Sequence, residues 1–201
     1  MGVKKNKDIR LQVPGGETTV LLHTCCAPCS SAIIEAMMKD GITPVIYYCN
    51  PNIYPLEEYE IRKNECTRYA RSLGLEIVDA DYDHENWLDA VKGLEGEPER
   101  GGRCLRCFKI RLLRTAQYAA QRGIKVITTT LASSRWKSLD QINEAGRWAC
   151  QQIVPPDGKV IWWDHNWRKN GLQERRLQII KEYDFYNQLY CGCEFSMRKK
   201  D

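Results

Sequence analysis

No apolar run in the 201-residue sequence is long enough to span a membrane. The N-terminal stretch MGVKKNKDIRLQVPGGETT is polar and lacks the apolar region of a secretory signal peptide. Internal repeats and low-complexity segments are also missing, which argues against a solenoid or a fibrous chain. These absences predict a cytoplasmic protein with no membrane partner, whose thiols stay reduced.

The composition is that of one globular domain. Hydrophobic residues make up 43% of the chain and charged residues 28%, which at this length supports a core and speaks against wholesale disorder. We expect residues 1–17 to form a flexible arm that ends at the turn Pro14-Gly15-Gly16. Residues 18–201 are expected to form a single α/β domain, whose oligomeric state the sequence does not predict.

Apolar strands alternate with amphipathic helices along this domain, and glycine follows several of the helices. The alternation predicts an α/β fold with a mostly parallel central sheet flanked by helices. The expected strands cover residues 18–23, 43–48, 75–79, 124–130 and 159–163. The expected helices begin at residue 30 or 31 and at residues 56, 85, 103, 138 and 171, the last being a C-terminal helical segment.

Cysteine, with ten residues, is unusually frequent for a chain without signs of secretion. The motif HTCCAPCSS holds Cys25, Cys26 and Cys29, and the distant motif RCLRC holds Cys104 and Cys107. Thiolates collected from two loops suit zinc or an iron–sulfur cluster. Because ligands bind beyond the carboxyl ends of parallel strands, we expect both motifs to meet at one end of the sheet.

Spacing alone leaves the ligand set open. Cys26 and Cys29 form a second C-x-x-C pair and are the favoured partners of Cys104 and Cys107. The adjacent Cys25 and Cys26 need a sharp turn to reach one metal. Zinc and an iron–sulfur cluster remain equal alternatives, and a thioredoxin-like redox pair at Cys26 and Cys29 is a third interpretation.

Cys191 and Cys193 near the C-terminus form a separate candidate. Two thiols separated by one glycine can close a strained and labile disulfide, and the glycine supplies the backbone freedom. A redox-active pair is therefore one interpretation, and two further ligands or two idle thiols are the others.

Three polar residues at the ends of predicted strands are candidates for proton transfer or metal ligation: His23, Asp81 and Asp83. A hydrogen-bonded wall residue is the structural alternative for His23. A helix cap is the alternative for the aspartates.

Basic side chains are clustered, although the net charge is only +4. Residues 100–114 hold six basic residues and no acidic one, and such a run either binds phosphates or forms a solvated helix face. The stretch IWWDHNWRKNG could stack a nucleic-acid base, with Arg168 and Lys169 on phosphates, or it could form a strand and core edge.

Several long motifs together resemble the cobalamin-independent epoxyqueuosine reductases, the QueH family. They are LLHTCCAPCSS, YYCNPNIYPLEEYEIR, DADYD, KGLEGEPERGGRCLRCFKIRL, TTTLASSRWKS, WRKNG and YCGCEFS, in matching order from about Leu21 to Ser196. The resemblance implies an oxidoreductase that removes the epoxide oxygen of epoxyqueuosine at the wobble position of tRNA, the last step of queuosine biosynthesis. The expected α/β layout is similar to that of the adenosine-hydrolase-like (HUP) proteins.

The resemblance also implies the cofactors and their ligands. A [4Fe–4S] cluster is expected on Cys25, Cys26, Cys104 and Cys107. A mononuclear iron is expected beside the cluster, with Cys29 as a candidate ligand. Cys191 and Cys193 match the redox-active pair of the family. Contacts with tRNA are expected from Arg135, Lys137, Arg168 and Lys169, and the sequence does not identify the electron donor.

Two alternative functions remain. A tRNA sulfur-transferring enzyme of related fold would need a glycine-rich pyrophosphate loop where this chain has Cys and Pro, so ATP binding is not expected. A zinc-stabilised tRNA-binding module would lack the broad absorption at about 400 nm that an iron–sulfur protein shows.

Overall fold

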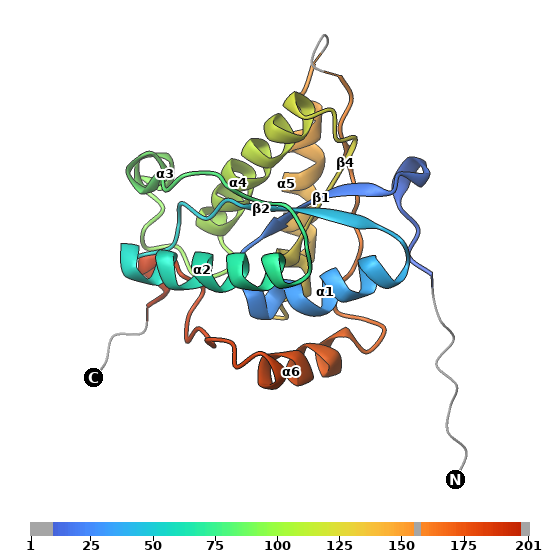
Figure 1. Ribbon diagram of the computed structural model, residues 1–201. Coiled ribbons are helices and arrows are strands. Elements are labelled where there is room, and N and C mark those ends of the chain that lie inside the picture. Colours follow the sequence, from blue (N-terminus) through green and yellow to red (C-terminus); the bar gives the residue numbers. More distant parts are fainter. Residues whose placement is uncertain (1–9, 155–157, 198–201) are drawn as a thin grey trace.

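A sheet of five parallel strands forms the centre of the molecule in the computed structural model, which describes residues 10–154 and 158–197 (Figure 1). The strands are β1 (Thr19–Thr24), β2 (Thr43–Tyr48), β3 (Ile77–Asp79), β4 (Val126–Thr129) and β5 (Ile161–Trp162). Their order in the sheet is β3-β2-β1-β4-β5, and each neighbouring pair is parallel. The predicted parallel α/β fold is therefore confirmed.

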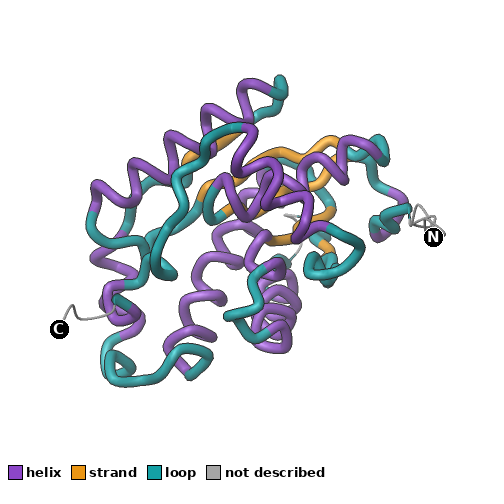
Figure 2. Tube along the Cα trace, turned by 90° about the horizontal axis from the view of Figure 1, so that it is seen from below, coloured by secondary structure: helices purple, strands orange, loops and turns teal. Residues whose placement is uncertain are grey.

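Helices cover both faces of the sheet. They are α1 (Ala27–Lys39), α2 (Leu56–Ser72), α3 (His84–Val91), α4 (Gly102–Gln121), α5 (Leu139–Gln151) and α6 (Leu172–Glu182). In Figure 1, α1 and α2 lie below the sheet and α4 and α5 lie above it, while α6 packs outside α1. Figure 2 shows from below how loops join the alternating helices and strands. None of the helices in the described ranges is long and apolar enough to cross a membrane.

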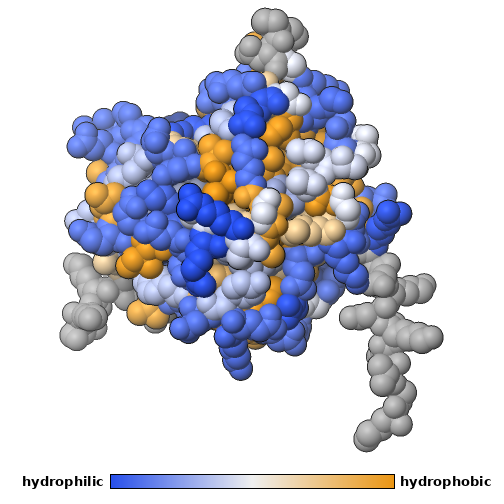
Figure 3. Space-filling model, in the orientation of Figure 1, coloured by the Kyte–Doolittle hydropathy of each residue, from blue (hydrophilic) through white to orange (hydrophobic). Residues whose placement is uncertain are grey.

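The central strands are apolar because both faces of the sheet are covered. In β1 and β2 every residue after the first is buried, as expected for parallel strands between two helix layers. On the other side of the sheet, Gly146 lets α5 approach β5, since a Cβ atom there would lie 2.2 Å from the ring of Trp162. The face drawn in Figure 3 is mostly hydrophilic, and hydrophobic residues show only between polar ones.

The helix after the first cysteine motif begins earlier than expected. We predicted a start capped by Ser30 or Ser31, but α1 begins at Ala27, with the extended Cys26 as N-cap. Pro28 fits the first turn because the amide groups there have no partner within the helix. Both serines are consequently buried inside α1. This early start places Cys29 in the first helical turn.

The predicted base-stacking role of the tryptophan-rich stretch is wrong. Trp162, Trp163 and Trp167 are at most 9% exposed and belong to the main core. The indole N–H of Trp167 donates a hydrogen bond to Thr128 Oγ1 at 3.3 Å. The strand and core-edge interpretation therefore holds for all three rings.

Part of the predicted arm lies against the domain. Residues 1–9 are outside the described ranges. Beyond them, the backbone N–H of Leu11 donates to Asp40 Oδ2 at 2.6 Å, and Leu11 and Val13 pack against the core. The chain then forms a short 3-10 turn at Pro14–Gly16 before entering β1.

Candidate metal centre and active-site cavity

The first cysteine motif follows β1, which pairs with β4 near the middle of the sheet, and it therefore lies where a ligand is expected. The chain runs from β1 toward β2 and β3 on one side and later enters β4 and β5 on the other. Ligands bind at such a switch point, beyond the carboxyl ends of the strands. Thr130, directly after β4, accepts a hydrogen bond from the backbone N–H of Cys25 at 3.2 Å. Its hydroxyl donates to Cys25 Sγ at 3.4 Å.

A cavity of about 720 Å³ opens at this switch point. Its size is within the range of roughly 300–1,000 Å³ that is usual for sites of small organic ligands. Five cysteines from three separate parts of the chain line it: Cys25, Cys29, Cys104, Cys191 and Cys193. The predicted convergence of the cysteine motifs at one end of the sheet is therefore confirmed.

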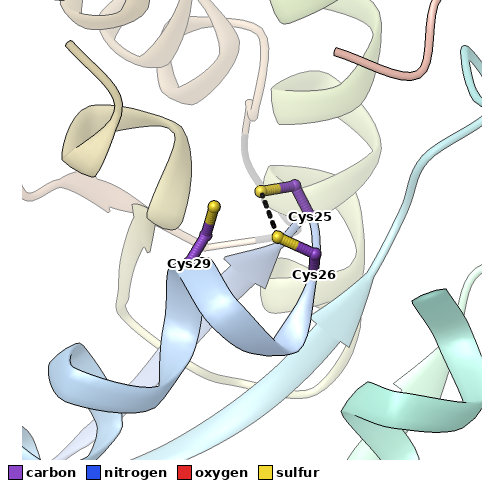
Figure 4. A group of neighbouring side chains, drawn as sticks. All are labelled: Cys25, Cys26 and Cys29. Atoms are coloured by element: carbon purple, nitrogen blue, oxygen red, sulfur yellow. Dashed lines mark hydrogen bonds between the residues drawn. The ribbon is translucent and has the colours of Figure 1, made fainter. Parts of the chain in front are cut away.

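The sulfur atoms of Cys25, Cys26 and Cys29 lie within 4.8 Å of one another and point toward one space (Figure 4). Cys25 Sγ and Cys26 Sγ are 3.8 Å apart. The sharp turn that we expected for the adjacent pair is present. Cys25 directly follows β1, and Cys26 is the N-cap residue of α1. Three thiols at this spacing could hold a metal ion.

The pKa values of the three thiols are shifted in different directions. Hydrogen bonds from Cys26 and Cys29 hold the pKa of Cys25 well below its usual value, against the effect of burial and with help from Lys137. Burial raises the pKa of Cys26, and the shared hydrogen bond with Cys25 raises that of Cys29 to about 12. Metal binding would release the protons of these two thiols.

Cys104 and Cys107 lie one turn apart at the start of α4. Cys104 lines the cavity and accepts a hydrogen bond from the backbone N–H of Arg100 at 3.3 Å. Cys107 is buried in a small apolar cluster with Trp87, Val91 and Cys193. The close three-sulfur group does not include either residue, so the four-ligand set remains a prediction.

A buried guanidinium lies behind the cysteines. Arg111 is 2% exposed and donates to the carbonyl oxygen of Cys49 at 3.2 Å, to Asn50 Oδ1 and to Cys107 Sγ at 3.9 Å. No carboxylate pairs with it in the described parts of the chain. Burial alone would lower the pKa of Arg111. The sulfurs of Cys107 and Cys25 raise it by more than burial lowers it, so the pKa of Arg111 lies above its usual value. A buried cation without a carboxylate needs another negative partner. Burial raises the pKa of the Cys107 thiol, so Cys107 would supply that charge once a metal binds it and displaces its proton.

Lys137 contacts the first of the two C-terminal cysteines within the cavity. Its ammonium group donates to Cys191 Sγ at 3.4 Å. Although burial lowers its pKa, the sulfurs of Cys191 and Cys25 raise it above its usual value. Lys137 is thus a cation held among thiols.

The C-terminal tail, residues 186–197, is fastened over α2. Arg62, paired with Glu58 at 2.6 Å, donates to the carbonyl oxygens of Tyr190 and Cys191 at 3.2 Å each. The backbone N–H of Tyr54 donates to the carbonyl oxygen of Gly192 at 2.8 Å. These contacts fix the backbone that carries the two tail cysteines.

Several predicted residues lie outside the cavity lining. His23 is fully buried, with its ring nitrogens bonded to Thr129 Oγ1 and the carbonyl oxygen of Cys49. Burial lowers its pKa to about 3, so the imidazole is neutral. Asp81 is exposed. Asp83 is the N-cap residue of α3, but its side chain makes no capping bond and accepts a hydrogen bond from the side chain of Asn86. Their role in proton transfer remains a prediction.

The four predicted tRNA contacts divide into two groups. Arg135 and Lys137 line the cavity, whereas Arg168 and Lys169 do not. The guanidinium of Arg168 donates to the carbonyl oxygen of Lys137 at 2.8 Å. Arg168 therefore supports the loop on which the first two residues lie.

Four residues of the site were missed by the sequence analysis: Arg62, Arg111, Thr130 and Gln188. Gln188 donates to Cys26 Sγ at 3.0 Å, and nothing local in the sequence indicates that contact. For Arg111 a pattern was present. Arg103, Cys107 and Arg111 recur every fourth residue of α4, and all three are buried, which a solvated basic face would not be.

A parallel α/β fold with a thiol-lined, cationic cavity at its switch point is typical of a protein that holds a soft metal or carries out thiol redox chemistry. Residues 20–199 match the family described as "Epoxyqueuosine reductase QueH". The chain belongs to this family.

Individual relatives agree with that assignment. The chain is 48% identical over 189 residues to an epoxyqueuosine reductase QueH of Haemophilus influenzae, covering 94% of this chain and 76% of the relative. It is 46% identical over 190 residues to the protein of that name from Acinetobacter baylyi, covering 94% of this chain and 85% of the relative. It is 35% identical over 185 residues to the one from Thermotoga maritima, covering 90% of this chain and 92% of the relative.

Proposed function

We propose that this protein deoxygenates epoxyqueuosine in tRNA to queuosine, with an iron–sulfur centre and a dithiol as its redox groups. Membership of the epoxyqueuosine reductase family supports the reaction. The observation that carries the chemistry is the convergence of five cysteines on one cavity beside a buried arginine that has no carboxylate partner among the residues the structure describes.

The donor set fits an iron–sulfur cluster. Clusters are held by cysteine thiolates, commonly four, and Cys25, Cys26, Cys104 and Cys107 are proposed as the ligands. Cys29 is proposed as a ligand of an adjacent iron. The positive charges of Arg111 and Lys137 would offset the negative charge of several thiolates in a poorly solvated site. When bound, the iron centre supplies single electrons and Lewis acidity.

The tail dithiol can balance the reaction. Removal of the epoxide oxygen needs two electrons and two protons and leaves an alkene and water. Oxidation of the Cys191 and Cys193 thiols to a disulfide releases two electrons and two protons, so one dithiol matches one turnover. A low-molecular-weight thiol or a protein dithiol would then have to reduce the disulfide.

The residues around this dithiol have separate roles. Lys137 would stabilise the thiolate of Cys191 that forms before the sulfur is oxidised, since its ammonium is 3.4 Å from that sulfur. Arg62 holds the carbonyl oxygens of Tyr190 and Cys191 and thereby orients the tail. Asp81 and Asp83 are proposed proton donors that would act from outside the cavity lining; Lys137, within it, is the alternative. His23 has a neutral ring that is bonded to Thr129 and to the carbonyl oxygen of Cys49, so we propose for it the role of a hydrogen-bonded wall residue.

Anaerobic reconstitution with iron and sulfide tests the proposal. We expect broad visible absorption at about 400 nm and, in mass spectra of tRNA that carries epoxyqueuosine, the loss of one oxygen atom. Cys104→Ser should lower the iron content and abolish the mass change. Cys150→Ser is the matched control, because Cys150 lies on α5 and does not line the cavity. An unchanged mass with every reductant would contradict the proposed reaction.

A further inference from the structure

Trp136 lies beside the cavity and is far more exposed than the other tryptophans. It lines the cavity and is 70% exposed. Of the six tryptophans, four are at most 9% exposed and Trp148 is partly buried. Leu189, which also lines the cavity, is 92% exposed. Two large apolar side chains at one rim indicate a binding surface rather than chance exposure.

The loop that carries Trp136 is held in place from both sides. The guanidinium of Arg100 donates to the carbonyl oxygens of Arg135 and Trp136 at 2.8 and 3.0 Å. Gln141 in turn donates to the carbonyl oxygen of Arg100 at 2.8 Å. Arg168 donates to the carbonyl oxygen of Lys137, also at 2.8 Å. These bonds hold the backbone in position, so little conformational entropy remains to be lost when a ligand stacks on the ring.

The charge around this ring is strongly positive. Seven basic residues and one acidic residue line the cavity, the acidic one being Glu99. The guanidinium of Arg135, next to Trp136, is exposed and makes no hydrogen bond or ion pair with any residue that the structure describes. An aromatic ring beside such a guanidinium suits an unpaired nucleotide, whose base stacks and whose phosphate is anionic.

We infer that Trp136 and Arg135 form a stacking site for an unpaired RNA nucleotide next to the modified one. The base stacks on the indole ring and its phosphate lies on the guanidinium. This inference rests on the proposed function, in which the modified nucleoside enters the thiol-lined cavity. The stacking site then makes the enzyme prefer an RNA loop to the free nucleoside.

Tryptophan fluorescence tests the site directly. An anticodon stem-loop RNA with guanosine at the wobble position is titrated into the reconstituted protein. We expect the RNA to quench the emission of exposed Trp136. Trp136→Ala should remove this quenching and weaken RNA binding about tenfold (about 1.4 kcal/mol). Arg135→Gln should weaken binding while keeping the quenching at saturation. Trp148→Phe is the control and should change neither.

Quenching that persists in Trp136→Ala, or an unchanged dissociation constant, would overturn the inference. Failure of the wild-type protein to bind the RNA would also overturn it and would leave a protein partner as the occupant of this rim. Activity gives a separate readout: Trp136→Ala should lower the ratio of kcat/KM for epoxyqueuosine RNA to that for the nucleoside. If neither substrate is deoxygenated, the proposed function fails, while the fluorescence result still decides the stacking site.

Discussion

Arg111 shows at the level of one residue why the site needs negative charge. Its side chain is buried, and its partners are a carbonyl oxygen, an amide oxygen and a thiol. We expect Arg111→Met to lower the iron bound per chain after reconstitution, because the charge that offsets the thiolates is gone. The amide oxygen of Asn50 would also lose its donor, which costs about 1–3 kcal/mol of stability, whereas the carbonyl oxygen of Cys49 keeps its hydrogen bond with His23.

Arg111→Lys separates these two effects. It keeps the charge but loses the forked geometry of the guanidinium, so iron binding should recover more than the free energy of unfolding does. Iron is measured by colorimetric assay and stability by denaturant unfolding of the metal-free protein. Full iron content in Arg111→Met would show that the positive charge is not required.

The tail cysteines give a second prediction at the residue scale. A double Cys191→Ser, Cys193→Ser variant should retain the absorption spectrum of the iron centre but lose multiple turnover, because the two-electron donor is missing. The measurement is product formed per enzyme over time with an excess of thiol reductant. Sustained turnover in this variant would remove the tail pair from the mechanism and favour the interpretation as idle thiols.

The basic run at residues 100–114 shows what sequence could and could not predict about single residues. Its charge suggested phosphate binding, yet Arg103 and Arg111 are buried, and Arg103 donates to backbone carbonyl oxygens of the preceding loop. The burial follows from the four-residue period of α4. The partners of Arg111, Cys49 and Asn50, come from a loop distant in sequence, and no local pattern specifies them. The cysteine motifs were recognisable because their chemistry is rare.

Among the elements, the C-terminal tail depends most on one backbone conformation. Gly192 has φ +108°, and a Cβ atom there would lie 2.9 Å from Ile53 Cγ1 and 3.0 Å from Arg62 Nη1. We expect Gly192→Ala to shift the tail and to lower turnover at least tenfold while iron content stays normal. Strain of this kind costs about 1–3 kcal/mol, which local movement of the tail can relieve.

Gly96→Ala is the matched control for that substitution. Its backbone is not in the left-handed region, and a Cβ atom there would meet nothing within 4 Å. Turnover of this variant should equal that of the wild type. Normal turnover in Gly192→Ala would mean that the tail geometry does not limit the reaction.

The order of strands and helices was predictable because each element has its own periodicity and a glycine often follows it. The ends of elements were less predictable. Strand β5 covers only Ile161–Trp162 of the five residues expected, and the predicted strand at 124–130 ends in a 3-10 turn at Thr130–Ser133. Both differences depend on pairing with a neighbouring strand: β4 pairs with β1 and β5, and β5 pairs with β4. Such contacts lie far apart in sequence and have no local signature.

At the scale of the whole molecule, charge is distributed unevenly. The net charge is only +4, but basic residues outnumber acidic ones seven to one around the cavity. Because much of the positive charge lies where the substrate enters, RNA binding should depend on salt far more than the net charge suggests. If three or four phosphates are neutralised, affinity should fall roughly 15- to 50-fold between 50 and 200 mM salt.

Binding of the anticodon stem-loop RNA at several salt concentrations measures this dependence, and the slope counts the phosphates that are contacted. Arg135→Gln should reduce the slope by about one contact, since its guanidinium is exposed and has no partner among the described residues. Arg122→Gln is the control: Arg122 pairs with Glu76 at 3.0 Å at the far end of α4 and does not line the cavity. If Arg135→Gln leaves the slope as unchanged as the control does, the positive charge of the cavity offsets the thiolates alone and does not attract the nucleic acid.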